Sequence, residues 1–260
     1  MFNFFSKPAI SKPPRTIFKN RRIIIGDIHG HYDGLMELLE NVELGNDDQV
    51  YFLGDLIDRG PKSAEVVKFL RDNQYPCLLG NHEVMLLRAV YEAEDERVLN
   101  FWLKAGGDAT VASYGSEGIL RADLDWMASL PTYLDLDDVW LVHAGVDPYL
   151  RLDQQGEQQF CWMREKFFSS AFPYFEDKII VTGHTITFTL PGVAPGELAA
   201  GVGWLNIETG AYHRKSGWMT ALDINNKLVH QYNVFSKKYR CKKLEQITKQ
   251  IDPSKVTAYN

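Results

Sequence analysis

The chain has 260 residues, of which 45% are hydrophobic and 24% charged, and its formal net charge is −6. This composition is ordinary for a globular protein and excludes a largely disordered chain. The net negative charge excludes a protein whose main task is to coat nucleic acid, because neutralising many phosphates needs an excess of lysine and arginine.

The cysteines and the apolar runs indicate a cytoplasmic protein. Cys77, Cys161 and Cys241 are odd in number and show no C-x-x-C spacing, so we expect neither a disulfide framework nor a thiolate zinc site. The sequence shows no secretory signal pattern and no run of about 18 apolar residues that could cross a bilayer. We therefore expect no association with a membrane.

The ends of the chain differ from its middle. Three prolines (Pro8, Pro13 and Pro14) predict an irregular tail over residues 1–20. Residues 236–260 are rich in lysine and arginine, which predicts a basic C-terminal tail or a terminal helix. No linker or repeat divides the part between them, so residues 21–235 are expected to form one domain.

Short apolar runs alternate with helical patterns along this domain. The runs predicted to be strands are residues 23–25, 50–53, 77–79, 140–142 and 179–181. Apolar residues at helical spacing predict helices over residues 35–39 and 66–70, and one long helix or two over residues 83–104. This alternation is typical of a layered α/β fold whose strands are covered on both faces.

The pattern becomes strand-rich beyond residue 139. Residues 204–207 and 218–232 have the alternation of β-hairpins.

Polar residues flanked by glycine follow each of the five apolar runs. They are Gly26-Asp27-Ile28-His29-Gly30, Gly54-Asp55-Leu56-Ile57-Asp58-Arg59-Gly60, Gly80-Asn81-His82-Glu83, His143-Ala144-Gly145 and Gly183-His184-Thr185. A single Gly-Asp pair is usually a turn. Five such clusters at the carboxyl ends of successive strands predict a binding site, because ligands of open α/β sheets bind at that edge.

The candidate metal ligands in these clusters are oxygen and nitrogen donors without thiolates. They are Asp27, His29, Asp55, Asn81, His143 and His184. Such a set suits Mn²⁺, Fe or Zn²⁺ and is too rich in nitrogen for Ca²⁺ or Mg²⁺. Six ligands are too many for one catalytic ion with an open position, so the count predicts two ions. Asp55 is the candidate bridge between them.

The first three clusters resemble the signature blocks of the phosphoprotein phosphatase family of calcineurin-like metallophosphoesterases, and the similarity runs from about residue 22 to about residue 232. It is greatest to the bacterial and phage serine/threonine branch. Trp162-Met163-Arg164-Glu165 resembles the Trp-x-Arg block of that branch. Asn206-Ile207-Glu208-Thr209-Gly210-Ala211 resembles one of its strands, with Glu208 in place of the usual aspartate.

The resemblance implies a layered α-β-β-α sandwich of two mixed sheets flanked by helices, and two divalent metal ions. Manganese is the expected metal, with iron or zinc as alternatives. Asp27, His29 and Asp55 would hold one ion, whereas Asp55, Asn81, His143 and His184 would hold the other. Water held between the ions would attack the phosphorus directly.

The resemblance also implies roles for residues around the metals. The residues expected to bind the phosphoryl group are Arg59, Arg164, Asn81 and His82. His82 would also act as the general acid, and Asp58 would orient its ring. Arg164 could instead form a surface ion pair with Glu165 or Asp177. Glu83 could be a helix N-terminal charge or part of the site.

Three functions remain open at this point. The first is a protein serine/threonine phosphatase, acting also on phosphotyrosine, whose partner is a phosphorylated protein or peptide. The second is symmetrical hydrolysis of diadenosine tetraphosphate, although the enzymes with that activity lack the aspartate before the arginine and end the third block in Asp. Here Asp58 and Glu83 favour the phosphatase. The third is a catalytically silent metal-binding regulatory protein, which usually loses ligands that this chain keeps.

Overall fold

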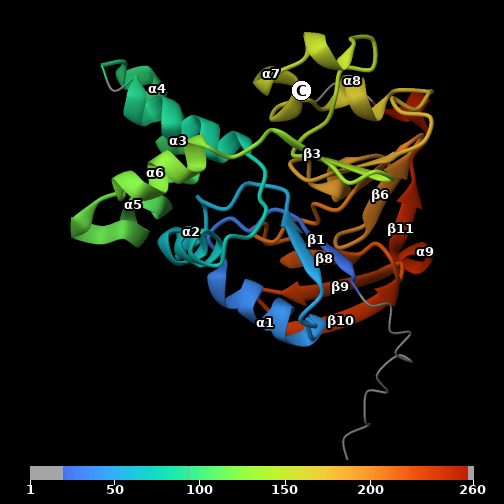
Figure 1. The fold of residues 1–260 in the computed structure, drawn as a ribbon, viewed down its shortest axis with the longest axis horizontal. Helices are drawn as coiled ribbons and strands as arrows, with labels where there is room; N and C mark the ends of the chain where they lie inside the picture. Colours follow the sequence, from blue (N-terminus) through green and yellow to red (C-terminus); the bar gives the residue numbers. More distant parts are fainter. Residues whose placement is uncertain (1–19, 93, 257–260) are drawn as a thin grey trace, which may run out of the picture.

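The computed structural model describes residues 20–92 and 94–256, and within them eleven strands form two mixed sheets (Figure 1). In spatial order the first sheet contains β10 (Lys238–Lys243), β9 (Leu228–Asn233), β8 (Trp218–Asp223), β1 (Arg22–Ile25) and β2 (Gln49–Phe52). The second contains β11 (Thr248–Gln250), β6 (Leu198–Gly201), β7 (Trp204–Asn206), β5 (Ile179–Thr182), β4 (Val139–Val142) and β3 (Tyr133–Asp135).

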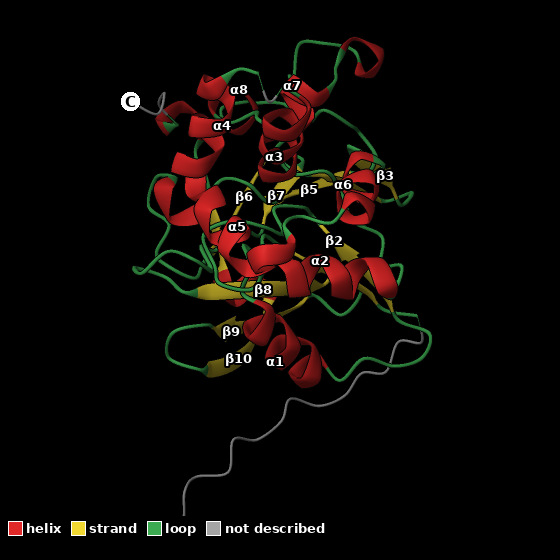
Figure 2. Cartoon of the chain, turned by 90° about the vertical axis from the view of Figure 1, so that its left-hand side faces the viewer, coloured by secondary structure: helices red, strands yellow, loops and turns green. Residues whose placement is uncertain are grey.

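Helices cover the outer faces of both sheets and form a lobe at one side, as Figures 1 and 2 show. The longer ones are α1 (Tyr32–Val42), α2 (Ser63–Asp72), α3 (Asn81–Tyr91), α4 (Glu96–Trp102), α5 (Asp108–Tyr114) and α6 (Arg121–Ala128). Single turns of α-helix are α7 (Glu157–Phe160), α8 (Glu165–Phe168) and α9 (Leu244–Ile247). A π-helical turn, η1 (Leu103–Gly107), joins α4 to α5, and 3₁₀ turns are η2 (Gly115–Glu117), η3 (Leu152–Gln154), η4 (Thr187–Thr189) and η5 (Pro253–Lys255).

Alternation of side chains along each strand produces the layers. Ile23 and Ile25 of β1 pack with α1 and α2, whereas Ile24 points to the second sheet. In β4, Leu141 faces the first sheet and Trp140 packs against α7 and α8. Both faces of these strands are therefore buried, which is why their sequences are continuously apolar. The predicted α-β-β-α sandwich is confirmed.

The predicted hairpins are present, since β8 pairs with β9 and β6 with β7, both antiparallel. The segment 83–104 contains two helices, because Asp95 caps the start of α4 by accepting from the N–H of Arg97 at 2.9 Å.

The third predicted strand, residues 77–79, is wrong in part. Cys77 forms a single parallel bridge with Phe52, and the N–H of Leu78 donates to the carbonyl of Phe52. Pro76 precedes this bridge and has no N–H, so the ladder cannot extend backwards. Forwards, the N–H of Leu79 donates instead to the carbonyl of Pro131. The segment still runs beside β2 and delivers Asn81 to the same edge.

The expected boundary at residue 236 also differs from the structure. β10 pairs with β9 over six residues and extends the first sheet, and β11 pairs in parallel with β6 and extends the second. The segment 238–250 therefore belongs to both sheets and is not a tail. Charged side chains hid this, because β10 is an edge strand and lysine is common on exposed edges.

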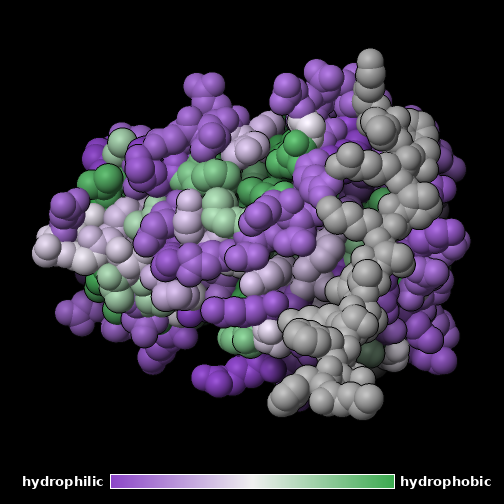
Figure 3. Space-filling view, turned by 90° about the horizontal axis from the view of Figure 1, so that it is seen from below, coloured by the Kyte–Doolittle hydropathy of each residue, from purple (hydrophilic) through white to green (hydrophobic). Residues whose placement is uncertain are grey.

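The remaining predictions concern the N-terminal tail, the cysteines and membrane association. The N-terminal tail lies outside the described residues apart from Asn20. Cys77, Cys161 and Cys241 are free thiols. Within residues 20–92 and 94–256, no helix is long and apolar enough to cross a bilayer. Among the described residues seen from below, hydrophilic side chains prevail, with smaller hydrophobic patches between them (Figure 3).

We predict that Ile247→Ala lowers the free energy of unfolding by about 2–5 kcal/mol, because Ile247 is 3% exposed and packs between the sheets. Lys249→Ala, an exposed neighbour on β11, is the control and should change it by less than about 0.5 kcal/mol. Urea denaturation measures both. Equal, small effects would show that the C-terminal segment does not contribute to the folded core.

Candidate metal centre

The predicted ligands follow strands from both sheets. β1 and β2 are parallel in one sheet, and β4 and β5 are parallel in the other, so their carboxyl ends lie at one edge of the sandwich. Asp27 and His29 follow β1, Asp55 follows β2, His143 follows β4 and His184 follows β5. The sixth predicted ligand, Asn81, does not directly follow a strand but is the first residue of α3. The structure brings all six together, and each is at most 7% exposed.

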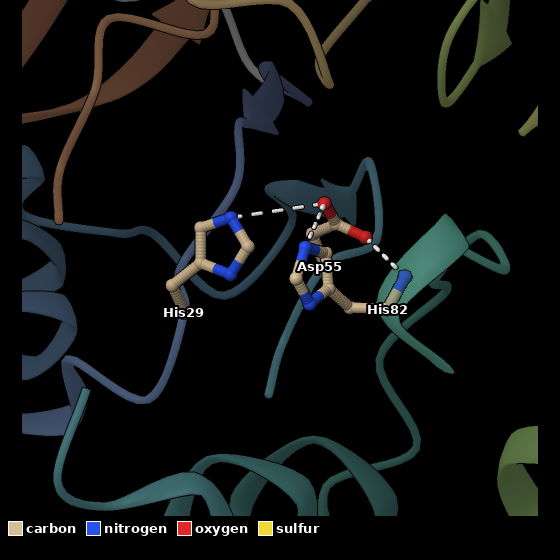
Figure 4. Close-up of side chains that lie close together, drawn as sticks. All are labelled: His29, Asp55 and His82. Carbon is tan, nitrogen blue, oxygen red and sulfur yellow. Dashed lines mark hydrogen bonds and ion pairs between the residues drawn. The ribbon is translucent and has the colours of Figure 1, made fainter. Parts of the chain in front are cut away.

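Asp55 is the centre of the cluster. Its Oδ2 lies 3.7 Å from Nε2 of His29 and 4.0 Å from Nε2 of His82, and its Oδ1 lies 3.3 Å from Nε2 of His143 (Figure 4 draws the first two). Donor atoms of His29, Asp55 and His82 lie within 4.8 Å of one another, and so do those of Asp55, His143 and His184. One carboxylate is thus shared by two potential cation sites.

Asn81 and Asp27 complete the two sides. Oδ1 of Asn81 lies 3.0 Å from Nε2 of His143 and 2.7 Å from Nδ1 of His184. Oδ2 of Asp27 lies 4.0 Å from Nε2 of His29, and both carboxylate oxygens of Asp27 accept from the N–H of His184 at 3.1 Å. Asp27 and His29 therefore flank Asp55 on one side, whereas Asn81, His143 and His184 lie on the other.

Backbone carbonyls orient two of the imidazoles. Nδ1 of His29 lies 2.9 Å from the carbonyl of Ile57, and Nδ1 of His143 lies 2.7 Å from that of Leu53. With the proton on Nδ1, the lone pair of Nε2 faces Asp55, which is the arrangement that metal ligation requires. Nε2 of His184 is buried and has no hydrogen-bond partner among the described residues.

The charges of the cluster call for cations. Burial raises the pKa of Asp27 well above its usual value, and the nearby carboxylates of Glu208 and Asp55 add to this. Burial also disfavours ionised Asp55, yet His143 and His82 hold its pKa well below the usual range. Burial opposes protonation of His143, but Asp55 raises its pKa to about 9. Positive charge is thus needed here, and divalent ions fit this donor set.

The loops that carry the ligands have unusual backbones. His29, Asp55 and His184 have φ values of 47°, 49° and 62°, in the left-handed region. Two glycines allow the loops to approach closely, because a Cβ at Gly80 would collide with Asp55 and one at Gly183 with Asp27. This is the structural reason for the glycines beside the ligands.

Glu83 holds these loops in place. It is the third residue of α3, and its carboxylate accepts from the N–H groups of Asp55, Leu56 and Gly80 at 2.9, 2.8 and 3.0 Å. Burial, together with the charge of Asp55, raises its pKa to about 7. Glu83 is therefore both a helix N-terminal residue and a support of the site, so the two interpretations of it hold together.

Asp58 positions His82. Its Oδ2 lies 2.6 Å from Nδ1 of His82, and Asp58 is fully buried. Its carboxylate also accepts from Nε1 of Trp102 at 3.0 Å and from the hydroxyl of Thr110 at 2.6 Å. These contacts fix the carboxylate, which in turn keeps a proton on Nδ1 of His82 and leaves Nε2 facing Asp55.

Arg59 approaches from the His29 side. Its Nη1 lies 2.7 Å from Nε2 of His29, and its guanidinium stacks on Tyr212 at 4.0 Å from the ring centroid. Nε donates to the carbonyl of Ala105 at 3.3 Å. The exposed guanidinium therefore lies at the rim of the cluster.

Arg164 approaches from the other side. It is exposed, and its Nη1 donates to Oγ1 of Thr185, the neighbour of His184, at 3.3 Å. The positive charge of Arg164 lowers the pKa of His184 further, after the larger effect of burial. The two arginines thus flank the ligand cluster.

Sequence reasoning missed several contributors. Thr110 and Tyr212 carried no signal, because they contact Asp58 and Arg59 only through the tertiary fold. Trp102 lay within the predicted helical segment 83–104, and Glu208 lay in a segment that resembled the family, but neither was given a role. Glu208 is buried, accepts from the N–H of Gly210 at 2.7 Å, and has a pKa raised to about 8 by burial.

A comparison with protein families matches residues 21–234 to calcineurin-like phosphoesterases. The chain belongs to the calcineurin-like phosphoesterase family. Members of this family use divalent metal ions, and the cluster around Asp55 supplies suitable ligands in this phosphoesterase. The narrower resemblance to bacterial and phage phosphoprotein phosphatases stays a prediction.

One sequence relative and two solved structures are similar to this phosphoesterase. A symmetrical bis(5'-nucleosyl)-tetraphosphatase of Vibrio campbellii is 31% identical over 136 residues, which cover 50% of this chain and 46% of the relative. The chain thus spans about half the length of this relative.

Two solved structures share the fold. One is assigned as a candidate diadenosine tetraphosphatase (TM-score 0.59, 20% identity, covering 86% of this chain and 93% of that one). The other is a cold-active protein tyrosine phosphatase (TM-score 0.56, 19% identity, covering 86% and 79%).

We predict that Asp55→Asn abolishes the binding of both metal ions, whereas Asp27→Asn weakens the binding of one ion. The reason is that Asp55 is shared by the two candidate cation sites and Asp27 is not. The measurement is the metal content per chain after dialysis against Mn²⁺, by atomic emission. Asp33→Asn, an exposed residue, is the control and should keep the wild-type content. Two ions retained by Asp55→Asn would exclude a shared carboxylate.

Proposed function

We propose that this phosphoesterase hydrolyses phosphate monoesters of proteins, on serine or threonine and also on tyrosine, by direct attack of water on phosphorus. Two divalent cations, when bound by the cluster around Asp55, would activate water and stabilise charge on the phosphoryl group. Mn²⁺ is the metal we propose, with Fe or Zn²⁺ as alternatives. The support is the shared-carboxylate geometry described above.

The two arginines would bind the phosphoryl group. Arg59 and Arg164 flank the cluster from opposite sides, so their guanidinium groups can donate to different phosphoryl oxygens. Guanidinium stays charged at every physiological pH, and two of them offset charge that develops during the reaction. Asn81 and His82, which border the cluster, would contact the same group.

The hydrogen bond between Asp58 and His82 is the observation that favours a phosphate monoester as the substrate. An alkoxide of serine or threonine is a poor leaving group, so a proton donor is needed as its bond to phosphorus breaks. With Asp58 at 2.6 Å from Nδ1, the imidazolium form of His82 would present an Nε2–H group to the site, and the Nε2 proton would pass to the leaving oxygen, leaving the ring neutral with its Nδ1 proton. The buried contacts to Trp102 and Thr110 prevent Asp58 from turning away.

A second candidate is symmetrical hydrolysis of dinucleoside tetraphosphates. The activity named for the Vibrio relative favours it more directly than any similarity favours a protein phosphatase. Its leaving group, a nucleoside diphosphate, departs without much help from an acid. The Asp58–His82 pair would then be of little use in the reaction, which is why the site geometry favours monoesters.

A substrate panel at equal manganese loading decides between the two. We expect higher kcat/KM for phosphoserine and phosphothreonine peptides than for diadenosine tetraphosphate. Preferential formation of two ADP molecules would replace the first candidate by the second. A metal-loaded protein that turns over none of these substrates would exclude both and favour a regulatory role.

We predict that His82→Asn lowers kcat for phosphoserine peptides by about 10²–10⁴-fold and lowers it less for p-nitrophenyl phosphate, whose leaving group needs little acid. Asp58→Asn should follow the same trend. Metal content is measured in parallel, because Nε2 of His82 lies within reach of Asp55. Loss of metal, or equal losses on both substrates, would remove His82 from the acid role.

A further inference from the structure

A large cavity lies at the end of the sandwich away from the metal centre. Its volume is about 890 Å³, within the range of about 300–1,000 Å³ that is typical of small-molecule sites. Ile179, the first residue of β5, lines it, whereas the other end of β5 leads to His184. The end of β10, α9 and the turn between β8 and β9 close the other sides, at the right of Figure 1.

The base and part of the sides of this cavity are apolar, whereas Asn226, Gln246, Thr248 and Gln250 make other parts of its lining polar. Ala200 and Leu205 are 8% and 2% exposed, so they form its base. Ile179, Leu228 and Leu244 are half-buried and form its sides. Contact with an apolar chain would remove the exposed parts of these side chains from water, which is favourable in proportion to the area covered.

Its rim is positively charged. Lys227, Lys242 and Lys243 line the cavity, are exposed, and form no ion pair among the described residues. Glu245 is the acidic residue that faces them within the described lining. The local excess of positive charge contrasts with the net charge of −6 of the whole chain. Such a rim attracts an anion and repels a cation.

We propose that this cavity binds a free single-chain amphiphile with an anionic head, of the fatty-acid type. The carboxylate would lie among Lys227, Lys242 and Lys243, and the chain would lie along Leu205 and Leu244. This site is independent of the phosphoesterase reaction.

The test uses decanoate and the full chain, with calorimetric titration as the readout. We expect one decanoate per chain and no binding of decylammonium. Replacing Lys227, Lys242 and Lys243 by Gln should weaken binding at least about tenfold.

The control replaces Lys237, Lys238 and Lys249 by Gln, which removes the same charge outside the cavity and should keep the affinity. Equal weakening by both triple variants, equal affinity for 1-decanol, or the absence of binding would overturn the proposal. Binding that appears only after Phe4 and Phe5 are replaced by Ser would also overturn it, since the N-terminal segment would then be the occupant.

Discussion

A buried carboxylate among buried imidazoles must be balanced by positive charge, and Asp55 imposes this requirement on the whole site. Its two oxygens face His29, His82 and His143 at 3.3–4.0 Å. Asp27 and Glu208 are buried nearby, and burial raises the pKa of both carboxyls, so their ionised forms need positive charge as well. Protons on imidazoles balance part of it, and divalent cations can balance more without leaving a carboxylate unpaired.

This requirement is met by loops in costly conformations. A left-handed φ value costs about 1–3 kcal/mol at a residue other than glycine. Five such residues in these loops adopt one: His29, Asp55, Asp58, Arg59 and His184. Glu83 offsets part of this cost by accepting three backbone N–H groups from the neighbouring loops. The sandwich provides the rest of the support, because each loop is anchored to a strand buried on both faces.

The helical lobe positions the side chains on which the proposed choice of substrate depends. Trp102 in α4 and Thr110 in α5 hold Asp58, and Asp58 holds His82, so the lobe determines how His82 faces the cluster around Asp55. The proposed preference for esters with poor leaving groups depends on this chain of contacts. The relatives named as tetraphosphatases show that the family fold also serves other phosphate chemistry.

The α/β class, four of the five strands that lead to the site, and the six candidate ligands that the structure brings together were all predictable from the sequence, because glycine-flanked polar residues directly follow apolar runs. It misjudged residues 77–79, where Pro76 and a single bridge prevent a regular strand, and residues 238–250, whose charged edge strand looks like a tail. The sequence named Asp55 as the candidate bridge, and the structure places it between both groups of candidate ligands. The fold alone revealed that Thr110 and Trp102 fix Asp58 and that Tyr212 supports Arg59. These contacts join residues far apart in the chain, and local sequence carries no record of which distant side chains packing will bring together.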